Sequence, residues 1–245
     1  MMQYILNTWI FVDRVLNGES QVAFLDDANE LGADGVEVRY EYFTDRATEA
    51  TAIRVKAANL GLTINLSVPD EVFVQGQVNQ KLDEYFNFAK QLGVTKIKFN
   101  LGDFTQYTGD LAHDLLIPAG LTVNIENDQT VISGHSAPIL EFLAAAQGAQ
   151  VPVGYVYDLG NWAVMGEDAT ETARLLAPYV DYIHLKNMQG AENAVTTDLN
   201  VGKLDWHQVL DILPRDIDIA IEFPITETQH IAQQLALVKA YKGDF

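Results

Sequence analysis

Two spacings of apolar residues alternate along the chain. Short runs rich in Val, Ile and Leu are typical of buried strands, and the longer stretches with apolar residues three or four positions apart are typical of helices. The expected strands are residues 4–10, 35–40, 62–68, 94–101, 121–126, 151–158, 180–186 and 216–223. The expected helices are residues 22–31, 48–59, 78–92, 107–116, 138–147, 170–179, 206–213 and 227–241. The pattern therefore predicts eight strands, each followed by a helix.

Glycines follow several of the expected helices. Leu31-Gly32-Ala33 and Leu92-Gly93-Val94 have the same form, and Leu60-Gly61-Leu62 is close to them. Glycine is common just after a helix because it lacks a Cβ that would oppose the left-handed conformation. These segments predict helix ends that lead directly into buried strands, and Pro69 is expected to end the strand at 62–68.

Regular alternation of this kind predicts a parallel sheet with helices outside it, and eight units favour closure into a barrel. The length of 245 residues suits one such barrel, and no linker or shift in composition divides the chain. The expected fold class is α/β, a single (β/α)₈ TIM barrel with eight parallel strands, as one domain over residues 1–245. A doubly wound open sheet is the alternative, but it would usually carry a Gly-rich phosphate turn after an early strand, and the sequence has none.

The charge balance restricts the classes of partner. The chain has 15 Lys and Arg against 34 Asp and Glu, a formal net charge of -19. That charge repels phosphate backbones and anionic lipid, so neither nucleic acid nor a membrane is expected as a partner. Cysteine is absent, which excludes a disulfide framework, a thiolate nucleophile and a Cys-based zinc site. Together with an N-terminus that lacks a targeting pattern, this favours a cytoplasmic location.

Polar side chains gather at the carboxyl ends of the expected strands. Active sites of parallel barrels are built at that rim, and polar residues within doubly buried strands need a reason. Glu126, Asp158, His184 and Glu222 lie at or near the ends of the last four strands. Any one of these carboxylates alone is more typical of a structural ion pair. Three in one pocket would raise one another's pKa unless a cation lay between them, so the set predicts a divalent metal site.

The ligand types indicate the metal and its chemistry. Two glutamates, one aspartate and one histidine suit one divalent ion, Mn²⁺ or Mg²⁺, with Co²⁺ or Zn²⁺ as alternatives. The ion would polarise the carbonyl of a hydroxy-ketone and stabilise the enediolate formed when a proton leaves the adjacent carbon. Glu126 and Glu222 would approach that carbon from opposite sides. Proton transfer by both gives epimerisation, whereas return by one residue to a neighbouring atom gives aldose-ketose isomerisation.

Four strand-end segments carry a resemblance to a known family. They are Val123-Asn124-Ile125-Glu126-Asn127-Asp128, Tyr157-Asp158-Leu159-Gly160-Asn161-Trp162, Ile183-His184-Leu185-Lys186-Asn187 and Ile221-Glu222-Phe223-Pro224. They resemble motifs of the sugar phosphate isomerase/epimerase family, the xylose isomerase-like TIM barrels. The similarity is strongest over residues 121–224 and extends to 35–39 and 66–69. It implies one metal held by Glu126, Asp158, His184 and Glu222, with Glu126 and Glu222 as the catalytic acid/base pair. Barrels of this family are often dimers or tetramers, so a homo-oligomer is among the expectations.

Six further residues are candidates for contact with a small sugar or polyol substrate. They are Lys186, Arg39, Lys98, Asn161, Trp162 and His135. Lys186 could bind a substrate hydroxyl or a phosphate, or help expel hydroxide in a dehydratase; a rim ion pair with Glu222 or Asp218 is the equal alternative. Arg39 and Lys98 are inward cations that could meet a phosphate or a carboxylate, and Glu37 beside Arg39 is a candidate for structural pairing. Trp162 could form a hydrophobic wall together with Trp9 or Phe11, and His135 follows the fifth strand on the catalytic face.

Asn161 is a departure from the pattern of the free-sugar epimerases, which usually carry a histidine at this place and an arginine soon after the histidine ligand. The departure weakens an assignment to 3-epimerisation of free ketohexoses. The His-x-Lys pattern of His184 and Lys186 is closer to inosose-dehydratase-like members of the family.

The sequence thus predicts a divalent-metal-dependent isomerase or epimerase that transfers a proton next to the carbonyl of a sugar, sugar phosphate or polyol. One alternative is a keto-polyol dehydratase, an inosose-dehydratase-like lyase on the same metal site. Another is a catalytically inactive sugar-binding barrel, although a pure binder has no use for two bases around one carbon. An endonuclease of abasic DNA, a hydrolytic relative, would need more metal ligands and a basic face.

Overall fold

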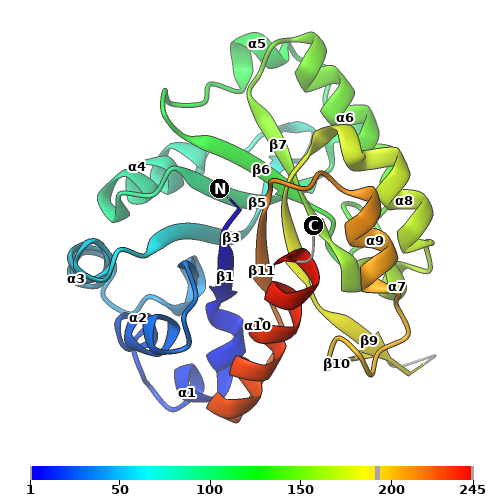
Figure 1. Cartoon of the computed structure of the whole chain (residues 1–245). Helices are drawn as coiled ribbons and strands as arrows, with labels where there is room; N and C mark the ends of the chain where they lie inside the picture. The colour runs from blue at the N-terminus through cyan, green and yellow to red at the C-terminus, as the bar shows by residue number, and fades with distance from the viewer. Residues whose placement is uncertain (1, 191–193, 244–245) are drawn as a thin grey trace.

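A closed parallel barrel forms the centre of the protein (Figure 1). The computed structural model describes residues 2–190 and 194–243. Eight strands of this part close in the order β2-β1-β11-β8-β7-β6-β5-β3, with β3 pairing back onto β2. The barrel strands are β1 Tyr4–Asn7, β2 Gly35–Arg39, β3 Thr63–Val74, β5 Lys96–Gly102, β6 Thr122–Glu126, β7 Val153–Asp158, β8 Val180–Leu185 and β11 Asp218–Ile221. The predicted α/β TIM barrel with eight parallel strands is confirmed.

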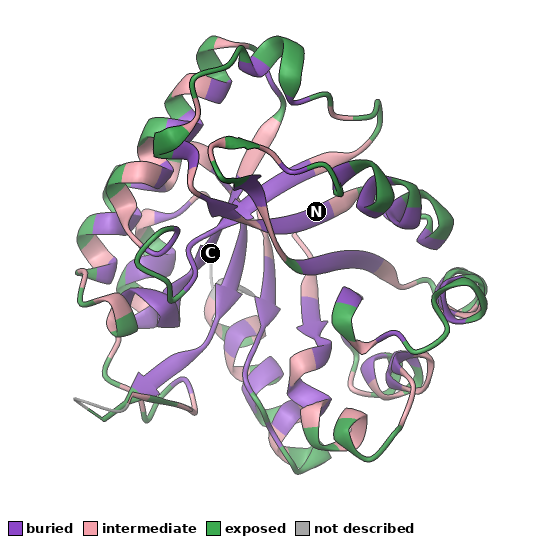
Figure 2. Cartoon of the chain, turned by 180° about the vertical axis from the view of Figure 1, so that it is seen from behind, coloured by how far each residue is buried: buried purple, intermediate pink, exposed green. Residues whose placement is uncertain are grey.

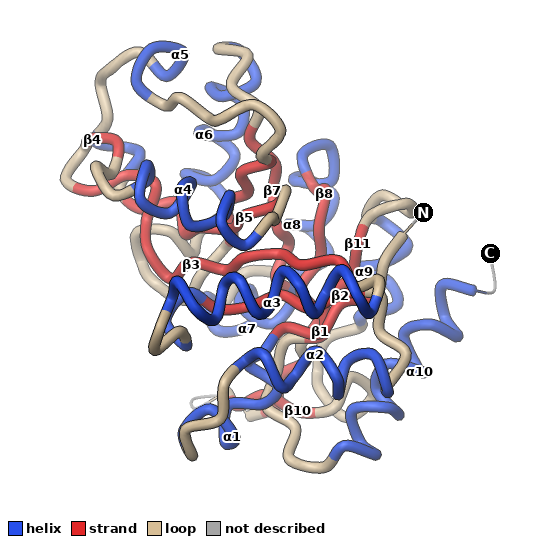
Figure 3. Tube along the Cα trace, turned by 90° about the vertical axis from the view of Figure 1, so that its left-hand side faces the viewer, coloured by secondary structure: helices blue, strands red, loops and turns tan. Residues whose placement is uncertain are grey.

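Helices surround the barrel on its outer side. They are α1 Val12–Leu16, α2 Gln21–Glu30, α3 Arg46–Leu60, α4 Leu82–Leu92, α5 Leu111–Asp114, α6 Ser136–Gly148, α7 Leu159–Met165, α8 Ala169–Leu176, α9 Trp206–Ile212 and α10 Thr228–Gly243. Figure 3 shows α2 and α3 lying alongside β1, β2 and β3. Gly61 and Gly93 end α3 and α4 with φ of 71° and 76°, the left-handed conformation predicted for them. None of the described helices is long and apolar enough to cross a membrane.

Five segments differ from the sequence-based expectation. The expected strand at 4–10 ends at Asn7 and is followed by a 3₁₀ helix, Thr8–Phe11, and by α1. β3 runs through Pro69 to Val74, where it forms a hairpin with β4 Gln77–Val78, so α4 begins only at Leu82. The proline does not end the strand because the pairing of β3 with β5 shifts register between Ser67 and Glu71, where a missing N–H costs no ladder bond. The expected helix at 107–116 is reduced to the four residues of α5. The polar segment after 187 contains a hairpin of β9 Asn187–Gln189 and β10 Val195–Thr197, and α7 was not expected.

The strand side chains divide into an apolar outer set and a partly polar inner set. Outward residues such as Val38, Leu66 and Phe99 pack with the helices into the main core, and Figure 2 shows buried strands inside a partly exposed shell of helices. Inside the barrel, a small apolar cluster consists of Ile5, Val156, Tyr182 and Ala220. Tyr182 precedes His184 on the same face of β8, and the two rings meet edge to face at 5.0 Å. This apolar layer therefore lies directly next to the polar strand ends.

Candidate metal centre

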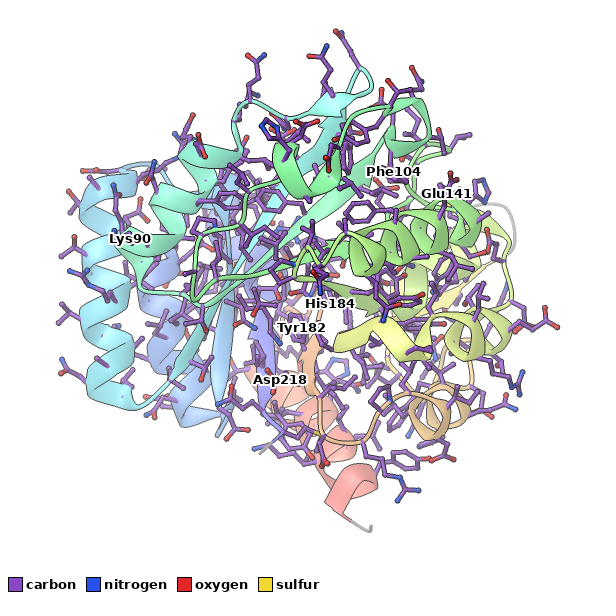
Figure 4. All side chains as sticks on the ribbon, turned by 90° about the horizontal axis from the view of Figure 1, so that it is seen from above. Lys90, Phe104, Glu141, Tyr182, His184 and Asp218 are labelled. Carbon is purple, nitrogen blue, oxygen red and sulfur yellow. The ribbon has the colours of Figure 1, made fainter. Side chains whose placement is uncertain are left out.

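The four predicted ligands meet at the carboxyl ends of four neighbouring strands. Glu126 and Asp158 are the last residues of β6 and β7, His184 lies in β8, and Glu222 follows β11. One ligand atom from each residue lies within 4.8 Å of the others, and all four residues are buried. Figure 4 shows His184 near the middle of the molecule, while Lys90 and Glu141 lie on the outer helices. The closed order of the strands brings together residues that are up to 96 positions apart, from 126 to 222.

Three atoms of this cluster have charged neighbours but make no hydrogen bond of good geometry within the described residues. They are Oε1 of Glu126, Oδ2 of Asp158 and Nδ1 of His184. Nδ1 of His184 lies 2.6 Å from Oε1 of Glu126 and 3.2 Å from Oε2 of Glu222. Buried polar atoms are nearly always hydrogen-bonded, so atoms of this kind that converge on one space need another partner. Three carboxylates and an imidazole fit a divalent cation as that partner.

Asp158 is fixed by the helix that it starts. Its side chain caps α7, since Oδ1 accepts a hydrogen bond of 3.1 Å from the backbone N–H of Asn161. Oδ2 therefore remains for the cluster, where Nζ of Lys186 lies 2.5 Å away. Burial raises the pKa of Asp158 to about 7, although the charge of Lys186 opposes the shift.

Both glutamates of the cluster are held ionised by neighbouring cations. Nζ of Lys98 lies 2.5 Å from Oε2 of Glu126. Burial raises the pKa of Glu126, but Lys98 and His184 outweigh burial and lower the pKa to about 2. Lys186 lies 3.2 Å from Oε2 of Glu222, and Nη1 of Arg39 lies 3.0 Å from its Oε1. Against the effect of burial, Lys186 and His184 lower the pKa of Glu222 well below its usual range. Each glutamate is thus a carboxylate that can accept a proton.

His184 is oriented by a third carboxylate, which comes from β2. Its Nε2 lies 3.0 Å from Oε2 of Glu37 in β2, and Nδ2 of Asn7 in β1 donates to Oε1 of Glu37 at 2.7 Å and to Oε1 of Glu222 at 3.1 Å. Burial would lower the pKa of His184, but Glu37, Glu222 and Glu126 outweigh it and raise the pKa well above its usual range. When Nε2–H donates to Glu37, Nδ1 faces the cluster, as a metal ligand requires. The sequence marked Glu37 as an inward polar residue, and Asn7 was missed although it is polar at a strand end.

A cavity of about 250 Å³ lies next to the cluster. Its lining consists of Trp9, Arg39, Pro69, Lys98, Asn100, Glu126, Asp128, Gln129, Asn161, Lys186 and Glu222. The structure thus brings Lys186, Arg39, Lys98 and Asn161 together with Glu126 and Glu222. Asn161 is held in place, since its Nδ2 donates to the carbonyl of Asn127 at 2.6 Å and its Oδ1 accepts from Gln129 at 2.8 Å.

Two predicted substrate residues do not belong to the cavity lining. Trp162 is fully buried, with its ring 6.0 Å from that of Tyr157. His135 lies with Nδ1 2.8 Å from Oε1 of Glu167, and its side chain is 41% exposed. The aromatic residue that does line the cavity is Trp9, which was a candidate for the hydrophobic wall together with Trp162 and Phe11. The predicted pairing of Lys186 with Glu222 is present, whereas Asp218 pairs with Lys96 instead.

No protein-family model and no curated protein sequence matches the chain. Solved structures do match it over nearly its full length. The probable 3-DHS dehydratase AsbF of Bacillus anthracis, described as involved in petrobactin synthesis, is 15% identical with a TM-score of 0.76, covering 97% of this chain and 99% of that one. A xylose isomerase domain containing protein of Salmonella typhimurium is 14% identical with a TM-score of 0.73, covering 98% and 96%. An L-ribulose 3-epimerase is 15% identical with a TM-score of 0.71, covering 100% and 95%. The chain therefore has the fold of the xylose isomerase-like TIM barrels, with a buried Glu/Asp/His/Glu cluster at the carboxyl ends of its last four strands.

Proposed function

We propose that this protein is a divalent-metal-dependent isomerase or epimerase of a small sugar or polyol, which moves a proton at the carbon next to a carbonyl. The observation that carries the proposal is the position of two glutamates. Glu126 and Glu222 both belong to the ligand cluster, both line the cavity, and they come from strands on either side of β7 and β8. Two ionised carboxylates on opposite sides of one carbon can remove and return a proton.

Glu126, Asp158, His184 and Glu222 would hold the metal ion. Mn²⁺ or Mg²⁺ suits this mainly oxygen-bearing set best, with Co²⁺ or Zn²⁺ as alternatives. A divalent ion there would polarise the substrate carbonyl and make the neighbouring C–H more acidic.

The remaining cavity residues would bind and orient the substrate. Arg39 and Lys98 form ion pairs with Glu222 and Glu126, and Arg39 keeps further N–H donors for substrate oxygens beyond its bonds to Glu41 and Glu222. Asn161 and Lys186 add further polar groups to the cavity lining. The apolar face of Trp9 suits the C–H face of a sugar ring.

A keto-polyol dehydratase is the second candidate, and Lys186 favours it. Its ammonium lies 3.2 Å from Oε2 of Glu222, so an acid and a base stand side by side in the cavity. Glu222 could remove the proton next to the carbonyl while Lys186 donates a proton to the leaving hydroxyl, which departs as water. The likeness to the 3-DHS dehydratase supports this alternative.

The test is deuterium exchange catalysed by the metal-loaded protein. The chelator-treated protein is reloaded with Mn²⁺ and incubated in heavy water with ketoses, sugar phosphates and keto-polyols, and products are followed by NMR. We expect deuterium at the carbon next to the carbonyl, with a rate about 10²- to 10⁴-fold lower in Glu126→Gln and Glu222→Gln. His135→Ala, which changes a residue outside the cavity lining, should keep the wild-type rate. Water loss would instead give an enone absorbance and select the dehydratase, and metal binding without exchange of any compound would select the sugar-binding barrel.

A further inference from the structure

Lys186 and a divalent ion require the same oxygen atom. Oδ1 of Asp158 is committed to the N-terminus of α7 through the backbone N–H of Asn161, so the carboxylate cannot turn without losing its cap. Oδ2 is the atom that faces the ligand cluster, and Nζ of Lys186 lies 2.5 Å from it. The two side chains are 5% and 0% exposed, so solvent does not screen this contact.

We propose that Lys186 is a displaceable counter-cation of the metal centre. A divalent ion must displace the ammonium from Oδ2 of Asp158, and the strength of that contact therefore sets the affinity for the metal. A site that can bind its ligand in only a fraction of molecules has an apparent affinity reduced by that fraction. The inference rests on the metal site of the proposed function and not on the reaction that the site performs.

Lys98 provides the contrast within the same cluster. Its ammonium lies 2.5 Å from Oε2 of Glu126, whereas Oε1 of Glu126 is the oxygen that lies 2.6 Å from Nδ1 of His184. One carboxylate can hold a lysine with one oxygen and a metal ion with the other. Lys98 is therefore compatible with a bound metal, and Lys186 is not in its present position.

The ammonium has a second neighbour that it can keep when it leaves Asp158. In its present position Nζ of Lys186 already lies 5.3 Å from the centroid of the Trp9 ring, a distance at which a cation is attracted to the face of an indole. Both residues line the cavity. Metal binding would therefore convert Lys186 from an internal counter-ion of Asp158 into a cavity group that faces the substrate.

The experiment compares Mn²⁺ binding by calorimetry to chelator-treated wild type, Lys186→Met and Lys98→Met at one pH. We expect Lys186→Met to bind Mn²⁺ at least about tenfold more tightly than wild type, since Oδ2 of Asp158 is then free of the competing cation in every molecule. Lys98→Met is the matched control, because it removes the same charge from the same cluster without freeing a ligand atom. Its affinity should stay within a few-fold of wild type or fall.

Equal or weaker binding in Lys186→Met would overturn the proposal, and so would equal tightening in Lys98→Met, because a general loss of positive charge would then explain the effect. Should Lys186→Met fold only when Mn²⁺ is present, Lys186→Gln and Lys186→Arg replace it. Glutamine should tighten binding and arginine, which keeps the charge, should not; the reverse order contradicts competition. Absence of Mn²⁺ binding in the wild type refutes the metal centre itself, an outcome distinct from the failure of competition alone.

Discussion

Glu37→Gln isolates the contribution of the carboxylate behind His184. Glu37 is fully buried, and its two oxygens are engaged by Nε2 of His184 at 3.0 Å and by Nδ2 of Asn7 at 2.7 Å. Glutamine keeps the size of the side chain but removes the charge that polarises the imidazole, and its NH₂ group must face one of two hydrogen-bond donors. Removal of such an outer carboxylate typically weakens metal binding by about 10- to 100-fold, or about 1.4 to 2.8 kcal/mol.

The assay is Mn²⁺ titration by calorimetry on chelator-treated protein, with Glu41→Gln as the control. Glu41 is close in sequence and also pairs with a cation, but its partner is Arg39 and its side chain is 33% exposed. The control should therefore change Mn²⁺ affinity less than about twofold, as expected for a partly exposed pair. Unchanged affinity in Glu37→Gln, with the protein folded, would refute the role of Glu37 in orienting His184.

Three further predictions concern the metal and the fold. His184→Ala should lower Mn²⁺ affinity by at least about tenfold in the same titration. Glu49→Gln should lower the free energy of unfolding, measured in urea at pH 7, by about 1 to 3 kcal/mol, because buried Glu49 accepts hydrogen bonds from two hydroxyls and two backbone N–H groups. The control is Glu141→Gln on an exposed position of α6, which should leave the free energy of unfolding unchanged. Burial raises the pKa of Glu49, but these hydrogen bonds outweigh it and lower the pKa. The stabilisation by Glu49 is therefore present above the pKa of the unfolded chain and should fade as the pH drops below about 4. A cost of Glu49→Gln that is constant with pH contradicts this. Gly35→Ala should destabilise the barrel and lower the melting temperature, since its Cβ would lie 2.6 Å from a backbone carbonyl oxygen of β3, and an unchanged melting temperature would contradict that packing.

The fold and the cluster of four residues could be predicted from sequence because both depend on local order. Each strand has its own apolar run, and the last four barrel strands are neighbours in space as they are in sequence. A polar residue at each strand end was therefore enough to predict Glu126, Asp158, His184 and Glu222 as one cluster. Pro69 misled the prediction. A proline usually ends a strand, but here a local shift of register lets β3 continue through it.

Contacts across the closure of the barrel could not be predicted in this way. The hydrogen bond of His184 with Glu37 joins residues 147 positions apart, and that of Asn7 with Glu222 joins residues 215 positions apart. Alternation shows that a side chain points inward, but its partner depends on how the first strands meet the last. The unexpected helix α7 also changed which side chains reach the cavity. It begins directly after its cap, Asp158, so that Asn161 joins the cavity lining while Trp162 packs on Tyr157.

The charges of the cluster explain why it is stable and still open to a metal ion. Four buried carboxylates are linked by ion pairs to four cationic groups, the carboxylates being Glu37, Glu126, Asp158 and Glu222 and the cations Arg39, Lys98, Lys186 and protonated His184. Buried charges are tolerated when they are paired in this way. Two of the cationic contacts, those of Lys186 and of the proton on Nδ1 of His184, involve atoms that a metal needs, whereas Arg39 and Lys98 use the other oxygens of the two glutamates. A divalent ion can therefore enter by displacing one ammonium and one proton, while the contacts that orient Glu126 and Glu222 remain.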